Sequence, residues 1–114
     1  PARERRYRGA MAWWGRFRSA RSRPPERTLD ERLDAFLDAQ RGVEAYLEPA
    51  TSLSGASVVL VAFDGRWSRF TVPDLADARS YARRRGIPCY DAPVVGYPRR
   101  MREFDQRRKQ GRPD

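Results

Sequence analysis

The sequence predicts a small α+β domain with a mostly antiparallel sheet of three or four strands, two packed helices and basic extensions at both ends. Two observations lead to this prediction. An apolar run from Ser57 to Phe63 is followed by Asp64-Gly65, a pair that favours a tight hairpin turn. Segments with helical periodicity lie on either side of this hairpin. The predicted order of elements is therefore α-β-β-β-α-β.

The first helix is predicted to begin after Thr28. Thr28 and Glu31 have the spacing of a capping box, in which two side chains satisfy backbone N–H groups of the first turn. Gly42 is a typical residue just past a helix end. Between them, apolar residues recur at the intervals of a single helical stripe. The stripe consists of Leu29, Leu33, Phe36 and Leu37.

Three strands are predicted before the second helix. Residues 43–48 alternate between apolar and polar side chains, which is typical of a short strand with one buried face. Residues 57–63 are apolar on both faces, so this strand is expected to be central. Residues 66–72 return as its hairpin partner.

The hairpin register depends on the turn. A two-residue turn at Asp64-Gly65 pairs Val59 with Phe70 and places both on one face. Trp67 and Arg69 then lie on the opposite face, beside Leu60. Two alternatives remain for this second face: it is open and contacts a ligand, or the helix that begins after Thr28 covers it.

The second helix is predicted to follow Pro73-Asp74 and to end at Gly86. A last strand over residues 87–92 is expected to return beside strand 57–63, antiparallel to it. Residues 99–110 have the composition of a basic helix with Met101 and Phe104 as its apolar contacts. The chain thus divides into a basic aromatic arm (1–27, with a short helix), an α+β core (28–98) and a basic tail (99–114).

The net charge of +9 is concentrated at the ends of the chain. Residues 1–27 hold nine Arg against two acids, and residues 99–114 hold seven cations against three acids. Residues 28–48, by contrast, have a net charge of −4. Basic ends on a nearly neutral body indicate an anionic partner.

The arm contains Trp13, Trp14 and Phe17 among its arginines. Three interpretations remain open: a helix that packs on its own domain or on a second copy, an arm that binds nucleic acid, or a weak foot on an anionic membrane. The double proline at 24–25 ends this segment.

Catalysis is not expected. The chain has no histidine and a single cysteine, Cys89, so the usual general base and the Cys–His pair are missing. It has no glycine-rich phosphate loop, and no cofactor or metal is predicted. Four carboxylates at strand ends are interpreted as turn and solvent-facing groups rather than Mg²⁺ ligands. These are Glu44, Glu48, Asp64 and Asp91.

The compartment is predicted to be cytoplasmic. A lone cysteine excludes an intramolecular disulfide. The sequence has no apolar run near 18 residues and no continuous apolar segment typical of a signal peptide.

The sequence therefore predicts a non-enzymatic binding module whose basic ends hold nucleic acid or a ribonucleoprotein surface. The alternative is a protein-interaction adaptor, homodimeric in one version, that uses the arm or the Trp67 face as its anchor. The residues expected to contact the anionic partner are Arg16, Arg18, Arg21, Arg23, Arg83, Arg84, Arg85, Arg99, Arg100, Arg102, Arg107 and Arg108. The expected aromatic contact set is Trp13, Trp14, Phe17 and Trp67, together with Arg69.

Overall fold

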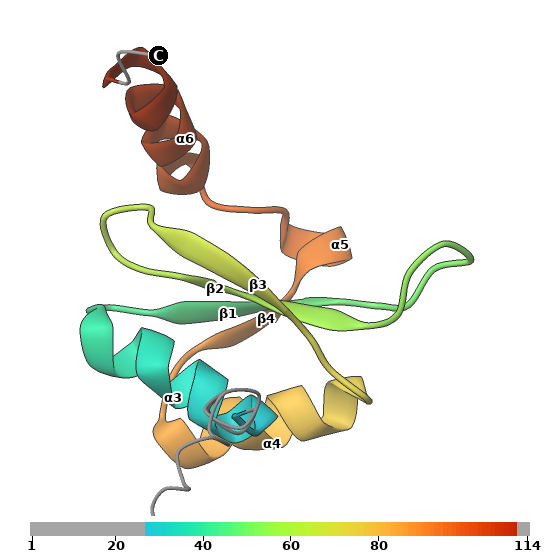
Figure 1. Cartoon of the computed structure of the whole chain (residues 1–114). Coiled ribbons are helices and arrows are strands. Elements are labelled where there is room, and N and C mark those ends of the chain that lie inside the picture. The colour runs from blue at the N-terminus through green and yellow to red at the C-terminus, as the bar shows by residue number, and fades with distance from the viewer. Residues whose placement is uncertain (1–26, 112–114) are drawn as a thin grey trace, which may run out of the picture.

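The computed structural model describes residues 27–111 and confirms the α+β class. Helices α3 and α4 cover one face of a four-stranded sheet, and α5 and α6 lie on the other side (Figure 1). No helix in this part of the chain combines the length and the apolar character that crossing a bilayer requires. In chain order the elements are α3 (Leu29–Ala39), β1 (Glu44–Glu48), β2 (Ser57–Val61), β3 (Trp67–Thr71), α4 (Leu75–Arg85), β4 (Cys89–Asp91), α5 (Ala92–Val95) and α6 (Arg99–Gly111).

Local sequence signals set the start of α3 and both ends of α4, whereas the predicted end of α3 at Gly42 is wrong, because α3 ends at Ala39 and Gln40 is already extended. The hydroxyl of Thr28 accepts the backbone N–H of Glu31 at 3.1 Å, and the Glu31 carboxylate accepts the N–H of Thr28 at 2.9 Å. The predicted capping box is therefore confirmed. Asp74 caps α4 by accepting the N–H of Ala76, and α4 ends at Gly86 in the left-handed conformation.

The sheet has the strand order β3-β2-β1-β4. Strand β2 is central, as predicted, and all five of its residues are buried. The prediction for the last strand is wrong: β4 pairs in parallel with β1, not antiparallel with β2. The reason is that β1 and β3 already occupy both edges of β2, so the free edge of β1 receives the strand that returns from α4.

The hairpin register is also one residue away from the prediction. Val59 pairs with Arg69 rather than with Phe70. The loop has three residues, 63–65, because the backbone N–H of Gly65 donates to the carbonyl of Ala62 and Gly65 adopts a φ of +96°. A turn of this kind adds one residue to the loop.

The one-residue shift moves every side chain of β3 to the other face relative to β2. Phe70 now faces α3 and α4 together with Leu60. Trp67 lies on the α5/α6 side, against a small core. The expectation that the helix after Thr28 covers Trp67 is therefore wrong.

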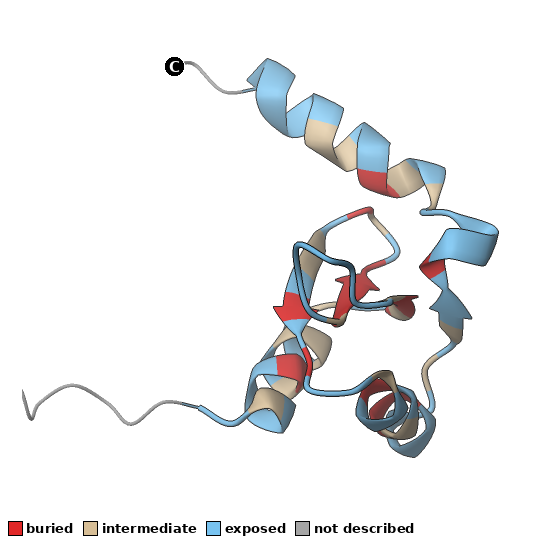
Figure 2. Ribbon diagram, turned by 90° about the vertical axis from the view of Figure 1, so that its right-hand side faces the viewer, coloured by how far each residue is buried: buried red, intermediate tan, exposed pale blue. Residues whose placement is uncertain are grey.

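The core has two unequal parts. The larger lies between the sheet and α3/α4 and includes Leu33, Leu47, Leu60 and Tyr81. The smaller lies under α5 and α6, where Met101 is the one buried residue of α6 (Figure 2). Its buried members are Tyr46, Val59, Val61, Ala92 and Met101.

Helix α6 docks on the turn between β2 and β3. The indole N–H of Trp67 donates to Asp105 at 3.0 Å. Arg100 donates to the carbonyl of Ala62 and to the carboxylate of Glu44, both at 2.8 Å. A Cβ added at Gly65 would lie 2.1 Å from the Arg100 carbonyl oxygen. The close approach of α6 thus depends on a glycine at this position.

Candidate functional site

Helix α6 covers one end of the α5/α6 side of the sheet, and a cleft opens at the other end. The strand register places its side chains in three rows across β1, β2 and β3: Glu44–Val61–Trp67, Tyr46–Val59–Arg69 and Glu48–Ser57–Thr71. Tyr90 of β4 extends the middle row. Helix α6 contacts the first row through Arg100, Met101 and Asp105. The third row is polar and forms the floor of a cleft.

Three arginines gather around one aromatic ring where α6 meets the hairpin turn. The guanidinium carbons of Arg66, Arg107 and Arg108 lie 5.5, 6.0 and 5.6 Å from the centroid of Phe104. Within residues 27–111, no carboxylate lies within ion-pair distance of any of the three. Arg107 donates to the backbone carbonyl of Asp64 at 3.0 Å. We call these residues the Phe104 cluster.

The surface of α6 is cationic beyond this cluster. The helix holds six cations against two acids, a net charge of +4, whereas residues 27–98 hold nine Arg against ten acids. Five of the six cations are exposed, and only Arg100 is partly buried by its contacts with the sheet. The positive charge of the described domain therefore belongs to α6.

The arginines at the end of α4 have a different environment. Arg84 forms an ion pair with Asp30 at 3.1 Å. Arg85 pairs with Asp34 and, at 3.5 Å, with Asp38. Three arginines of α4 were predicted to contact an anionic partner. The acids of α3 offset the charge of two of them, Arg84 and Arg85.

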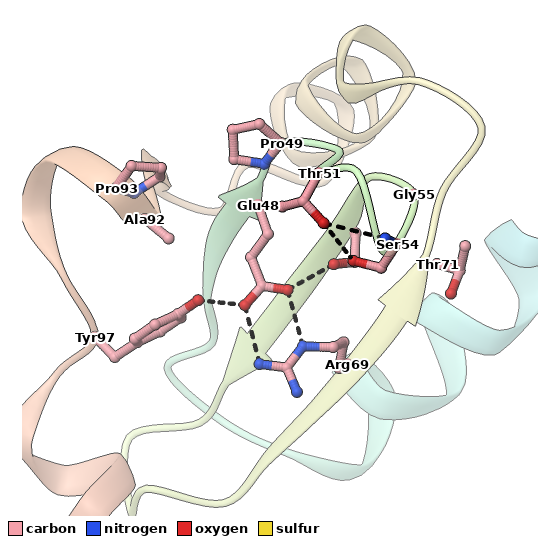
Figure 3. A pocket seen from close by; sticks show the side chains of 11 residues that line it. Glu48, Pro49, Thr51, Ser54, Gly55, Arg69, Thr71, Ala92, Pro93 and Tyr97 are labelled. Carbon is pink, nitrogen blue, oxygen red and sulfur yellow. Dashed lines mark hydrogen bonds and ion pairs between the residues drawn. The ribbon is translucent and has the colours of Figure 1, made fainter.

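The cleft beside α5 has a volume of about 600 Å³ and is organised around one carboxylate (Figure 3). Glu48 accepts from Nε and Nη2 of Arg69 at 2.8 and 2.9 Å, from the Ser57 hydroxyl at 2.5 Å and from the Tyr97 hydroxyl. The bonds from Arg69, helped by those from Ser57 and Tyr97, outweigh burial and lower the pKa of Glu48 to about 2. Its lining residues are Glu48, Pro49, Thr51, Ser54, Gly55, Ser57, Arg69, Thr71, Ala92, Pro93 and Tyr97.

This bonding makes Glu48 a weak base, because its carboxylate oxygens already accept four hydrogen bonds and its pKa of about 2 lies far below neutral pH. The ion pair with Arg69 also makes the floor of the cleft electrically neutral.

A second, smaller cleft of about 220 Å³ adjoins the first and shares Tyr97 with it. Three tyrosine rings meet there: the centroid of Tyr46 is 5.4 Å from that of Tyr90 and 6.1 Å from that of Tyr97. Tyr46 is buried and donates to Glu44 at 2.7 Å. Burial, together with this bond, raises the pKa of Tyr46 to about 12. Tyr90 and Tyr97 are 37% and 36% exposed.

Cysteine and metal chemistry find no support in the described part of the chain. Cys89 is half-buried against the larger core, and this burial raises the pKa of its thiol, which lowers the thiolate fraction. Within residues 27–111, no group of three or more His, Cys, Asp or Glu side chains is placed to hold a metal ion.

The structure places the predicted site residues in different environments. Arg99, Arg102, Arg107 and Arg108 are exposed on α6, while Arg100 serves to dock the helix. Trp67 is half-buried, and the guanidinium carbon of Arg69 lies 5.4 Å from the centroid of the Trp67 ring. The predicted site residues that lie outside the described residues are Arg16, Arg18, Arg21, Arg23, Trp13, Trp14 and Phe17.

Sequence reasoning missed the tyrosine cleft. The alternation of residues 43–48 already places Glu44, Tyr46 and Glu48 on one face. Tyr97 lies in a turn-rich segment with no periodic pattern, and nothing in the sequence indicates that it meets Glu48.

Comparisons with known protein families, with curated protein sequences and with solved structures found no match to this chain.

Proposed function

We propose that this chain is a non-enzymatic, cytoplasmic nucleic-acid-binding module, in which the cationic surface of α6 contacts the phosphate backbone. The observation that carries the proposal is the Phe104 cluster. Three guanidinium groups converge within 5.5–6.0 Å of one ring centroid without a carboxylate from residues 27–111 to offset them. A phosphate is a suitable counterion because guanidinium groups bind it through paired N–H donors.

Contacts of this kind do not distinguish one base sequence from another, because the phosphate backbone is the same in all of them. Binding is therefore expected to be strong at low salt, to weaken steeply as salt is added and to depend little on sequence. The basic residues 1–26, which carry eight further arginines, are proposed to add to the same electrostatic attraction.

The test is fluorescence anisotropy of labelled RNA and DNA oligonucleotides with the full chain, between about 50 and 200 mM salt. The triple variant R66Q/R107Q/R108Q is expected to lose about tenfold or more in affinity and to lower the slope of log K against log salt by about 2 to 3.

The matched control is R27Q/R41Q/R83Q, which removes the same charge from three exposed arginines that form no ion pair within residues 27–111. It is expected to lose clearly less affinity. Equal losses in the two triple variants would show that total charge matters and the Phe104 cluster does not. Absence of binding by the wild type at about 50 mM salt would overturn the proposed function.

A protein-interaction adaptor is the second candidate, and one observation favours it. Val94 and Val95 are 81% and 56% exposed on α5, beside the tyrosine cleft. Paired apolar residues on a short exposed helix are suited to a protein contact. Light scattering of the wild type and of V94S/V95S at several concentrations tests this candidate, and a monomer in every case would count against the homodimeric version.

A further inference from the structure

We infer that Tyr90 and Tyr97 form a stacking platform for the bases of a single-stranded nucleic acid whose phosphates lie on α6; this inference rests on the proposed function. The platform is built from the β4 edge of the sheet and the segment after α5, where the two rings flank buried Tyr46. Aromatic side chains stack on any base, because every base has a π face.

A hydrogen bond holds the Tyr97 ring in place before a ligand arrives, and the Tyr90 ring packs beside the buried ring of Tyr46. The Tyr97 hydroxyl is bound by Glu48, and the hydroxyl of Tyr46 is bound by Glu44. Glu44 and Glu48 are in turn fixed by Arg100 and Arg69. The fixed Tyr97 ring loses little conformational entropy on binding, so its exposed face is preorganised for stacking.

The chemistry of the larger cleft also fits a nucleotide. Its floor carries hydroxyl groups from Ser57 and Thr71 beside the half-exposed Arg69. Ser57 and Arg69 already donate to Glu48, but an apolar side chain of a protein partner would cut the exposed Thr71 hydroxyl off from water, which is unfavourable. A base and its sugar combine an apolar face with polar edges, and the neutralised Glu48 does not repel the adjoining phosphates.

A chain of side-chain contacts connects the cationic helix α6 with the tyrosines. Asp105 of α6 binds Trp67, and Arg69 lies over the Trp67 ring. Arg69 also binds Glu48, which accepts the Tyr97 hydroxyl. Helices α5 and α6 lie on the same side of the sheet (Figure 1), so one strand of nucleic acid on this side can reach both the arginines of α6 and the tyrosines.

A single strand is favoured over a duplex for a geometric reason. In a duplex the faces of the bases are stacked on one another, whereas the unstacked bases of a single strand can lie on aromatic side chains. The platform therefore predicts a difference between two nucleic acids that carry the same phosphate charge.

The experiment compares a single-stranded oligothymidine with a duplex that presents an equal number of phosphates, both at about 50 mM salt. The double variant Y90L/Y97L is expected to weaken binding of the single strand by about tenfold or more and to leave duplex binding nearly unchanged. Y90F/Y97F keeps both rings and is the matched control; it loses only the bond from the Tyr97 hydroxyl to Glu48, so it is expected to weaken binding clearly less than Y90L/Y97L does. Thermal unfolding of both variants shows whether they remain folded.

The outcomes separate this inference from the proposed function. If Y90L/Y97L folds and binds the single strand as tightly as the wild type does, the platform is wrong although the proposed function stands. The platform is also wrong if Y90L/Y97L loses duplex binding to the same extent, because the loss would then not depend on unstacked bases. It is wrong too if the variant changes only self-association in light scattering, because the cleft would then be a protein contact. If the wild type binds neither nucleic acid, the proposed function fails first.

If Y90L/Y97L does not fold, the single variant Y90L replaces it, because no hydrogen bond within residues 27–111 depends on the Tyr90 hydroxyl. Amide chemical-shift changes at Gly96 and Tyr97 of the wild type on addition of oligothymidine would support the platform directly. Changes confined to α6 would overturn it.

Discussion

The two faces of the sheet use arginine in different ways. On the α3/α4 side, Arg84 and Arg85 are offset by the acids of α3, above the larger core. On the α5/α6 side the core is smaller, and the arginines of the Phe104 cluster have no carboxylate partner within residues 27–111. A run of arginines in the sequence therefore becomes a positive surface only where the fold brings no acids to it.

The two sides of the sheet are expected to differ most in how much their core residues contribute to the free energy of unfolding. Leu33 of α3 is fully buried in the larger core, so Leu33→Ala should lower the free energy of unfolding by about 3–5 kcal/mol. Met101→Ala on the other side should cost about 1–2 kcal/mol, because fewer buried residues surround Met101 and α6 can adjust. Urea denaturation measures both. An equal loss in the two variants would contradict the view that one core dominates.

The second prediction concerns a substitution that disturbs only the docking of α6 on the sheet. Gly65→Ala should lower the free energy of unfolding by about 2–4 kcal/mol, because the residue has a positive φ and a Cβ would collide with the Arg100 carbonyl. Displacement of α6 should also weaken nucleic-acid binding. Gly55→Ala is the control: a Cβ there meets nothing within 4 Å, and a change within about 0.5 kcal/mol is expected.

The third prediction concerns the cleft and its dependence on pH. Folding lowers the pKa of Glu48 from 4.5 to about 2, so its ion pair contributes stability above pH 4.5 that is lost as the pH falls through 2. Glu48→Gln should cost about 1–2 kcal/mol at pH 7, a value reduced for the exposure of Arg69, and should flatten the loss of stability in acid.

Glu103→Gln on the exposed surface of α6 removes the same charge and serves as the control for this measurement. Its unfolding free energy should follow the pH profile of the wild type. If Glu48→Gln does so too, the Glu48–Arg69 pair adds nothing to stability.

The smallest effect is expected when the acids of α3 are neutralised. D30N/D34N/D38N should release Arg84 and Arg85 and tighten nucleic-acid binding by about threefold to tenfold at low salt, with little change in stability. Adding R84Q/R85Q to this variant should reverse the gain. An unchanged affinity in D30N/D34N/D38N would show that nucleic acid does not approach the α4 arginines even when they are free.

The elements themselves were predictable because their signals are local. The capping box at Thr28 and the helix end at Gly86 depend on residues a few positions apart, and both are present in the structure. The apolar run in β2 predicted a central strand, and its residues are all buried. The basic helix predicted over residues 99–110 is α6.

The arrangement of the elements was less predictable. A turn of two or three residues at Asp64-Gly65 differs little in sequence, yet the choice decides which side of β3 faces α3. The position of β4 depended on which edge of the sheet stayed free, and this in turn depended on the pairing of β1 with β2. The tyrosine cleft combines β1, β4 and the segment after α5, so no single stretch of sequence could reveal it.

The sequence by itself determined the α+β class, the start of α3, both ends of α4, the central strand and the excess of positive charge, because these follow from neighbouring residues and composition. Only the tertiary structure decided the register of β3, the docking of α6 on Gly65 and which arginines meet acids. The physical reason is that ion pairing and side-chain stacking act over a few ångströms, and only the folded chain brings distant residues within that range.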